Sequence, residues 1–164
     1  MPEEYHAQFP SLGEEDDSPP HITVLYVGDK FSDDIGPVVE STVKKDFFSG
    51  PLTVTIGEVE YFDNRDDSEK ETLVAHCKVT FSQRVSALRA ELHNNLIERQ
   101  VEVQDSYMDK TYAPHVTLAY YPKTGKWDET KEPPVYIGSV PKGISFNVSH
   151  IELWHGSDRT KFSL

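Results

Sequence analysis

Two segments of the chain each place a histidine two residues before a threonine. The first pair is His21 and Thr23, and the second is His115 and Thr117, 94 residues further on. Imidazole can accept or donate a proton near neutral pH, and a hydroxyl can donate a hydrogen bond to a phosphate oxygen. Hydrolysis of a phosphodiester needs a base for the nucleophile and an acid for the leaving oxygen. We therefore expect acid–base chemistry on a phosphodiester, without a metal ion or other cofactor.

The repetition of the pair is what favours function over structure. One histidine beside a threonine at the start of a strand is ordinary, but core packing has no use for the same polar pair twice. Metal binding is a weaker alternative, because each pair lacks a carboxylate or cysteine at ligand spacing. Five further histidines have no threonine two residues later, and we interpret them as surface or structural residues: His6, His76, His93, His150 and His155.

Both pairs lie in segments with the composition of β-strands. Residues 21–27 and 113–122 are rich in β-branched and aromatic side chains and are bounded by proline or glycine. Side chains alternate along a strand, so each histidine and its threonine should share one face. The alternate positions should face the core, and we therefore expect Tyr26 and Tyr120 to be core residues and not part of a site.

The rest of the chain predicts an α+β fold. Apolar residues at helical spacing predict a helix from Pro37 to near Gly50 and a second over 83–100. Alternation predicts further strands, and the segment after Gly143 reads either as one bulged strand or as two short ones. The other expected segments are strands at 52–62 and 71–81, a hairpin loop at 63–70, an excursion of undetermined role at 123–143, and a terminal strand at 160–164.

Composition narrows the class of protein. A formal net charge of −12 argues against binding long nucleic acid, which relies on many basic contacts. No apolar run is long enough to span a membrane, and the start of the chain has no secretory signal, so we expect a cytoplasmic protein with no membrane partner. The acidic run 13–17 is interpreted as a solvated loop, and the lone Cys77 as a small core residue.

The repeated pattern resembles the 2H phosphoesterase superfamily, which has two His-x-Thr/Ser motifs, as in 2′-5′ RNA ligase-like proteins and cyclic nucleotide phosphodiesterases. The likeness covers residues 21–121 and the strands of 144–164. It implies one bilobal domain over 1–164, with two pseudo-symmetric lobes, antiparallel sheets lining a central cleft, and helices packed outside. In its general sequence pattern the chain most resembles small 2H domains of tailed phages. It is more distantly similar to phage enzymes that destroy cyclic oligonucleotide immune signals.

The resemblance also implies roles for the motif residues. His21 and His115 would be catalytic, with the second histidine as the base toward water and the first as the acid. Thr23 and Thr117 would hold the phosphate. The expected function is hydrolysis of a small cyclic or oligomeric nucleotide, either a 2′,3′-cyclic phosphate or a cyclic oligonucleotide signal of the kind that anti-defence enzymes remove. For a phage protein the location would be the host cytoplasm.

Other residues are candidates for contact with a base. Tyr112 precedes the second motif and Trp154 lies near the end of an expected strand. Charge could come from four cations that the sequence does not place near the motifs: Lys110, Lys123, Arg159 and Lys161. The alternative function is a 2H-derived nucleotide-binding or viral assembly module without turnover, although retention of both motifs favours the enzyme. The sequence leaves the oligomeric state open.

Overall fold

The computed structural model describes residues 3–9, 19–28, 34–48, 52–64, 72–103, 113–122, 140 and 142–164. Within these residues the chain is α+β, as expected, with two α-helices and six strands. The chain divides into two compact units. Unit 1 comprises residues 1–22, 56–80 and 114–144, and unit 2 comprises 23–55, 81–113 and 145–164.

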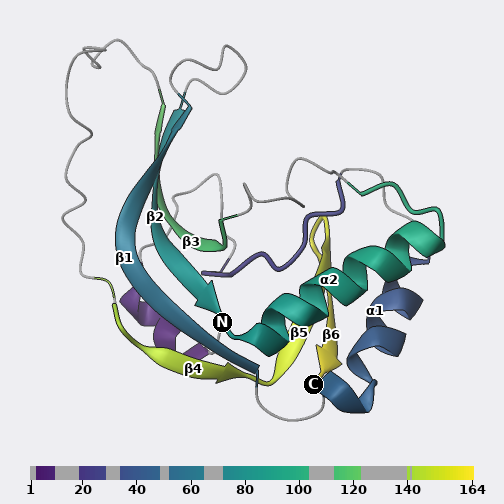
Figure 1. The fold of residues 1–164 in the computed structure, drawn as a ribbon. Helices are drawn as coiled ribbons and strands as arrows, with labels where there is room; N and C mark the ends of the chain where they lie inside the picture. Colours follow the sequence, from purple (N-terminus) through teal and green to yellow (C-terminus); the bar gives the residue numbers. More distant parts are fainter. Residues whose placement is uncertain are drawn as a thin grey trace. The chain divides into compact units, whose positions relative to one another are not determined.

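Unit 1 is built on three neighbouring strands (Figure 1). These are the second part of β1 (Leu52–Asn64), β2 (Thr72–Phe81) and β3 (His115–Pro122), in the order β3-β2-β1. Strands were expected in all three places. The core face of β2 consists of alternate buried residues, as the period of a strand requires: Leu73, Ala75, Cys77 and Val79. Cys77 is fully buried, which confirms its interpretation as a core residue.

The antiparallel pairing of β2 with β3 contains a shift of one residue. Ala75 pairs with Ala119, but His76 pairs with Thr117, so the ladder skips Leu118. Such a β-bulge reverses which face the following residues occupy relative to a regular strand. The alternation of side chains between the two faces of the sheet is therefore shifted by one residue between the start and the end of β3.

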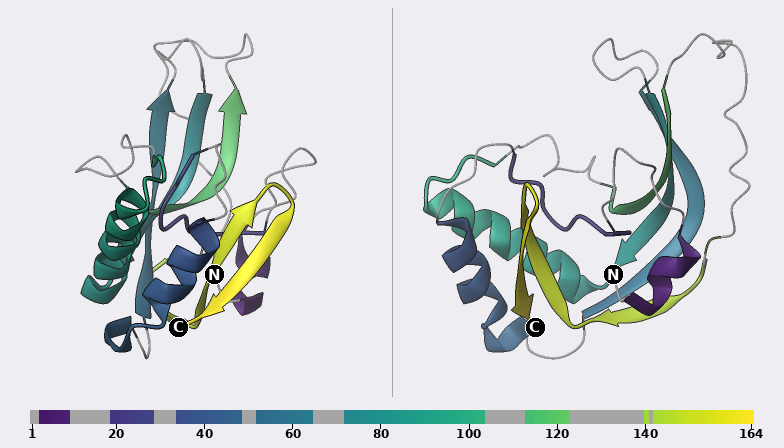
Figure 2. Two further views of the ribbon diagram at one scale, coloured as in Figure 1. Left: turned by 90° about the vertical axis from the view of Figure 1, so that its right-hand side faces the viewer. Right: turned by 180° about the vertical axis from the view of Figure 1, so that it is seen from behind.

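Unit 2 contains both helices and a two-stranded sheet. α1 (Ile35–Val43) packs against α2 (Gln83–Glu98) and also contacts β6 (Figure 2). β5 (His150–His155) and β6 (Asp158–Ser163) form an antiparallel pair, and β4 (Ser145–Val148) pairs with the first residues of β1. The segment after Gly143 thus forms two strands in two sheets, and the expected terminal strand is confirmed as β6.

The second helix agrees with its expected range. The hydroxyl of Ser82 accepts a hydrogen bond from the Val85 amide at 3.4 Å and so caps the first turn. The buried residues of α2 recur at spacings of three and four, as its apolar pattern predicts: Val85, Leu88, Leu92 and Leu96. The helix stops where Gln100 adopts a left-handed φ of 61° and the Val101 amide donates to the Leu96 carbonyl.

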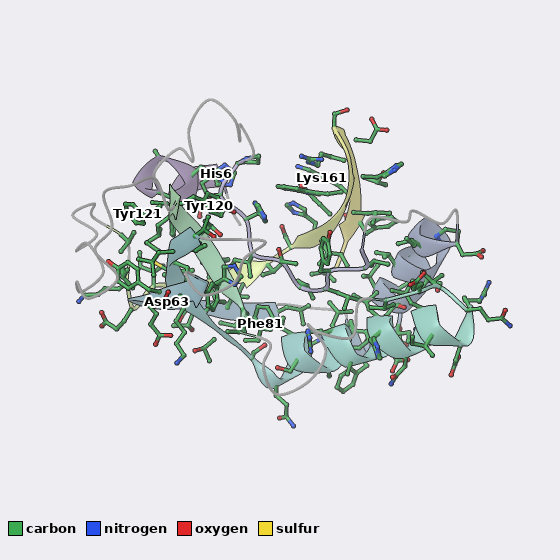
Figure 3. All side chains as sticks on the ribbon, turned by 90° about the horizontal axis from the view of Figure 1, so that it is seen from above. His6, Asp63, Phe81, Tyr120, Tyr121 and Lys161 are labelled. Atoms are coloured by element: carbon green, nitrogen blue, oxygen red, sulfur yellow. The ribbon has the colours of Figure 1, made fainter. Side chains whose placement is uncertain are left out.

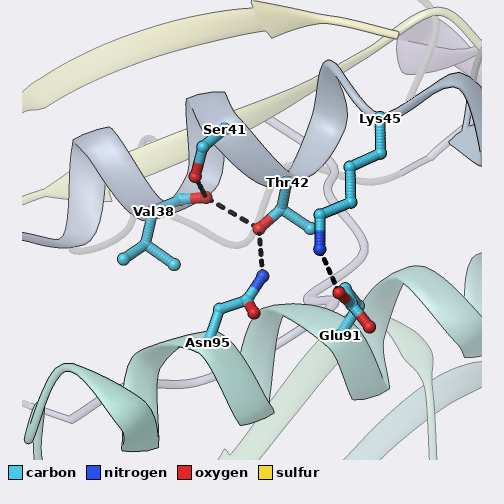
Figure 4. Close-up of polar contacts among 6 residues, drawn as sticks. All are labelled: Val38, Ser41, Thr42, Lys45, Glu91 and Asn95. Carbon is cyan, nitrogen blue, oxygen red and sulfur yellow. Dashed lines mark hydrogen bonds and ion pairs between the residues drawn. The ribbon is translucent and has the colours of Figure 1, made fainter.

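Polar contacts join the two helices (Figure 4). The fully buried Thr42 hydroxyl donates to the Val38 carbonyl at 2.7 Å and accepts from the Asn95 side-chain amide at 2.8 Å. Lys45 also pairs with Glu91. Because this buried hydroxyl both donates and accepts a hydrogen bond, it helps to fix the position of α1 along α2.

One expected strand is absent. Residues 19–28, which carry the first His-Thr pair, belong to neither sheet of the described part of the chain. Pro19 and Pro20 have no amide hydrogen to donate to a ladder, which disfavours strand pairing at this point. The expectation that both motifs begin strands is therefore correct only for His115.

Other expectations are refined or fall outside the described residues. α1 begins at Ile35, two residues before the expected Pro37, and ends at Val43, well before Gly50. The acidic run 13–17, most of the hairpin loop and nearly all of the 123–143 excursion lie outside. Neither helix of the described residues is long and apolar enough to cross a membrane.

Candidate functional site

The second motif lies at the start of β3 in unit 1. Pro114 precedes the strand, and its carbonyl accepts a hydrogen bond from the Val79 amide at 2.9 Å, which anchors His115 against β2. In the ladder His115 pairs with Lys78 and Thr117 pairs with His76. Paired residues share a face, so the motif and these two β2 residues lie on the same side of the sheet.

That face carries a cluster of three rings from three strands. Phe62 of β1 stacks on His76 of β2, with centroids 3.7 Å apart and an interplanar angle of 12°. His115 meets both rings edge to face, at 4.8 Å from Phe62 and 5.3 Å from His76. We call Phe62, His76 and His115 the ring cluster. It fixes the surroundings of His115 on one side.

His76 is the buried member of the ring cluster. Only 2% of its surface is exposed. Burial lowers the pKa of His76 below its ordinary value of 6.5, since a charged imidazole would lose its hydration. The Val74 carbonyl, 3.4 Å from Nδ1, raises that pKa, and positive charge on His115 lowers it. His76 is therefore neutral at neutral pH.

Two ion pairs involve β1 residues of unit 1. Lys78 lies 3.4 Å from the carboxylate of Glu60, and Lys142 lies 3.3 Å from Glu58. Both pairs are exposed to solvent, where such contacts add little to stability. Neither pair leaves a net positive charge beside His115.

The first motif is held by a hydrogen bond within its own segment and not by a strand ladder. His21 is partly exposed, and its Nδ1 donates a hydrogen bond to the Pro19 carbonyl at 3.1 Å. Since Nδ1 carries that proton, Nε2 is the nitrogen of this ring that can exchange a proton with a substrate. His21 belongs to unit 1 and Thr23 to unit 2.

The two tyrosines that were expected in the core are exposed, so that prediction was wrong. Tyr120 is 51% exposed and Tyr26 is 39% exposed. Tyr120 pairs with Val74, which alternates with His76 along β2, so the bulge brings it to the face of His115. Tyr120 and Tyr121 project from opposite sides of β3 (Figure 3). Alternation along a strand does not apply to Tyr26, because its segment joins neither sheet that the structure describes.

The other substrate-contact candidate that the structure describes lies in unit 2. Trp154 of β5 donates its indole N–H to Glu152 at 2.9 Å, and the Arg159 guanidinium lies 3.8 Å from the ring centroid. Glu152 also pairs with His150 at 3.3 Å and with Lys161 at 3.4 Å. The tryptophan is thus held in place by a polar network. Tyr112, Lys110 and Lys123 lie outside the described residues.

The burial of His76 agrees with its interpretation as a surface or structural residue. The sequence did not reveal that its ring lies in the ring cluster, diagonal to His115 across the ladder. Only the β2–β3 register reveals this neighbour, since no motif surrounds it. Among the described residues, no three His, Cys, Asp or Glu side chains are grouped to hold a metal ion.

The family model described as the 2′-5′ RNA ligase superfamily matches residues 7–160, which include both His-Thr pairs and every strand of the ring cluster. A search of curated proteins finds no significant match.

Proposed function

Because the chain belongs to the 2′-5′ RNA ligase superfamily, we propose that it hydrolyses a small nucleotide phosphodiester with His21 and His115 as its proton-transfer groups. The family model suggests phosphodiester hydrolysis or ligation in general. The more specific proposal rests on the position of His115. It is the first residue of β3, lies on the same face as Thr117 and packs within the ring cluster.

In the proposed reaction His115 acts as the base and His21 as the acid. His115 takes a proton from a water molecule as the water oxygen bonds to phosphorus. The bond from phosphorus to the leaving ribose oxygen breaks, and Nε2–H of His21 protonates that oxygen. The product of a 2′,3′-cyclic phosphate is a phosphomonoester. The hydrogen bond to the Pro19 carbonyl supports this role of His21, because it assigns one ring proton to Nδ1 and makes Nε2–H the proton that is transferred.

The threonines have the second role in the proposal. Thr117 shares the face of His115 and is partly exposed, so its hydroxyl can donate to a non-bridging oxygen as negative charge develops. Thr23 has the equivalent role in the first motif. Such a donor acts mainly on the transition state, because the charge on the oxygen is largest there.

The proposed substrate is small, such as a 2′,3′-cyclic phosphate or a cyclic oligonucleotide signal. The net charge of −12 and the neutralised pairs Glu60–Lys78 and Glu58–Lys142 support this choice. A long polyanion would need many unpaired cations to bind. We propose Tyr120 and Trp154 as contacts for a base, since each places an aromatic ring where it is at least partly exposed.

Hydrolysis assays test the proposal directly. The protein would be incubated with EDTA and 2′,3′-cyclic mononucleotides, cyclic di- and trinucleotides or ADP-ribose 1″,2″-cyclic phosphate. The same assays would use His21→Ala, His115→Ala and the matched control His93→Gln, a helix residue of unit 2 with no threonine two residues later. We expect turnover of one class in EDTA, with a loss of about 10²–10⁴-fold in each motif variant.

Each other outcome contradicts part of the proposal. Activity that disappears with EDTA, or that survives both motif substitutions, would rule out the two-histidine mechanism. Tight binding of one compound without any turnover would instead support a nucleotide-binding module derived from this family.

A further inference from the structure

The strongest unassigned feature is the position of His76 within the ring cluster. It lies on a strand without a motif, is almost fully buried, and contacts the one catalytic histidine that the sheet holds. A buried histidine in the core normally needs only a hydrogen-bond partner, and the Val74 carbonyl supplies one. The packing of its ring against both Phe62 and His115 goes beyond that requirement.

We propose that His76 is a positioning residue for His115: stacked on Phe62, it forms a wall that fixes the plane of the His115 imidazole. This inference rests on the proposed role of His115 as the base. The His76 ring is itself held at two places, by the Phe62 ring at 3.7 Å and by the Val74 carbonyl at Nδ1. Because the His76 ring is itself held at two places, it can restrict the rotation of the His115 ring that packs against it.

The electrostatics of the pair suit this role. Burial keeps the His76 ring neutral, so it presents no positive charge to an adjacent base. Two further charged groups act on the pKa of His76, Glu60 of β1 and Lys78 of β2, and these are paired with each other. Protonation of either imidazole disfavours protonation of the other, since the interaction of two titrating groups is reciprocal.

The test compares two substitutions at His76 with a control on the opposite face of the same strand. His76→Phe keeps a flat ring that can stack on Phe62, whereas His76→Ala removes the wall. Val79→Ala is the control, because Val79 is equally buried but faces the core. For each variant we would measure kcat, KM and thermal stability. Nuclear Overhauser contacts and line widths of the His115 ring protons would report its orientation without reference to activity.

The expected pattern separates positioning from mere stability. His76→Ala should lower kcat by about 10–100-fold with KM changed less than about threefold, because displacement of a catalytic group acts on the chemical step. His76→Phe should stay within about fivefold of the native kcat and keep the contacts of His115 to Phe62. Val79→Ala should lose stability but keep both the native kcat and the native His115 signals.

Two results would overturn the inference while leaving the proposed function intact. One is a native kcat and native His115 signals in His76→Ala, alongside inactivity of His115→Ala. The other is a loss of kcat in Val79→Ala equal to that in His76→Ala, which would attribute the effect to general destabilisation. If His115→Ala remains active, the proposed function fails, and the His115 ring signals still decide whether His76 orients that ring.

Discussion

The imidazoles of His76 and His115 meet edge to face, with ring centroids 5.3 Å apart and planes inclined by 71°. The pair joins a motif residue on β3 to a residue on β2 that no motif marks. Its members also differ in exposure, because His76 is buried and His115 is partly exposed. This difference in exposure fits the two proposed roles, in which His115 reaches the substrate and His76 supports it.

The buried member should make stability depend on pH. The pKa of His76 is lowered in the folded state, so below about 6.5 the unfolded chain binds a proton at this position more readily than the native chain. The free energy of unfolding should fall as pH decreases below that value. Urea unfolding at several pH values would measure the slope, and His76→Phe should reduce it. An equal slope in that variant would assign the effect to other groups.

Removal of the Thr117 hydroxyl should affect catalysis more than folding. Thr117→Val keeps a β-branched side chain in β3 but cannot donate to a phosphate oxygen, so kcat should fall by about 10²–10³-fold. Thr117→Ser should recover most of the activity. Thr55→Val, a threonine of the β1–β4 pair, is the control and should retain the native kcat. Similar kcat values for all three variants would contradict the role of Thr117.

The exposed Tyr120 should contribute to substrate binding. Tyr120→Val preserves strand propensity and removes the ring, so KM should rise about 5- to 150-fold, which corresponds to about 1–3 kcal/mol for one stacked base. Thermal stability should change little, because half of the side chain is in solvent. The exposed Phe47 of unit 2 provides the control Phe47→Ala, which should leave KM as in the native protein. An unchanged KM in Tyr120→Val would remove this tyrosine from the site.

The cysteine should be inert in the folded protein. Burial, and after it the charge of Glu58, raises the pKa of Cys77 to about 11. At pH 8 a disulfide reagent should react at least about 100-fold more slowly than with an exposed thiol, because little thiolate forms and access is blocked. Labelling should become complete in guanidinium chloride. Rapid labelling of the native protein would show that β2 opens locally.

The buried hydroxyl between the helices should matter for stability. Thr42→Val removes the donor to Val38 and leaves the Asn95 amide without this acceptor, so the free energy of unfolding should fall by about 1–3 kcal/mol. Ser41→Ala is the matched control, because Ser41 donates to the same carbonyl from an exposed position. That control should change stability by less than about 0.5 kcal/mol. Equal losses in urea titrations would contradict the special role of Thr42.

The sequence predicted those elements whose signal is local. The alternation in 52–62 and 71–81 and the apolar spacing in 83–100 correspond closely to β1, β2 and α2. The family and its two His-Thr pairs were also recognisable, because the repeat lies within short contiguous segments. The outcome differed for residues 19–28, which have the composition of a strand but pair with no strand among the described residues.

The remaining differences depend on pairing between strands. Regular alternation placed Tyr120 in the core, but the ladder skips Leu118 and reverses the phase beyond it. The contact of His76 with His115 was not predicted for a related reason, because it arises from the register of β2 against β3. A register is a long-range property, and composition around a single residue does not specify it.

The skipped Leu118 also decides whether Tyr120 shares the face of His115. Regular alternation with every residue kept would pair Tyr120 with Leu73 and turn it toward the core, whereas deletion of Leu118 would leave Tyr120 beside Val74. His115 would keep its partner on β2 in both cases. One residue of strand length thus decides whether an aromatic ring accompanies the histidine on its face of the sheet.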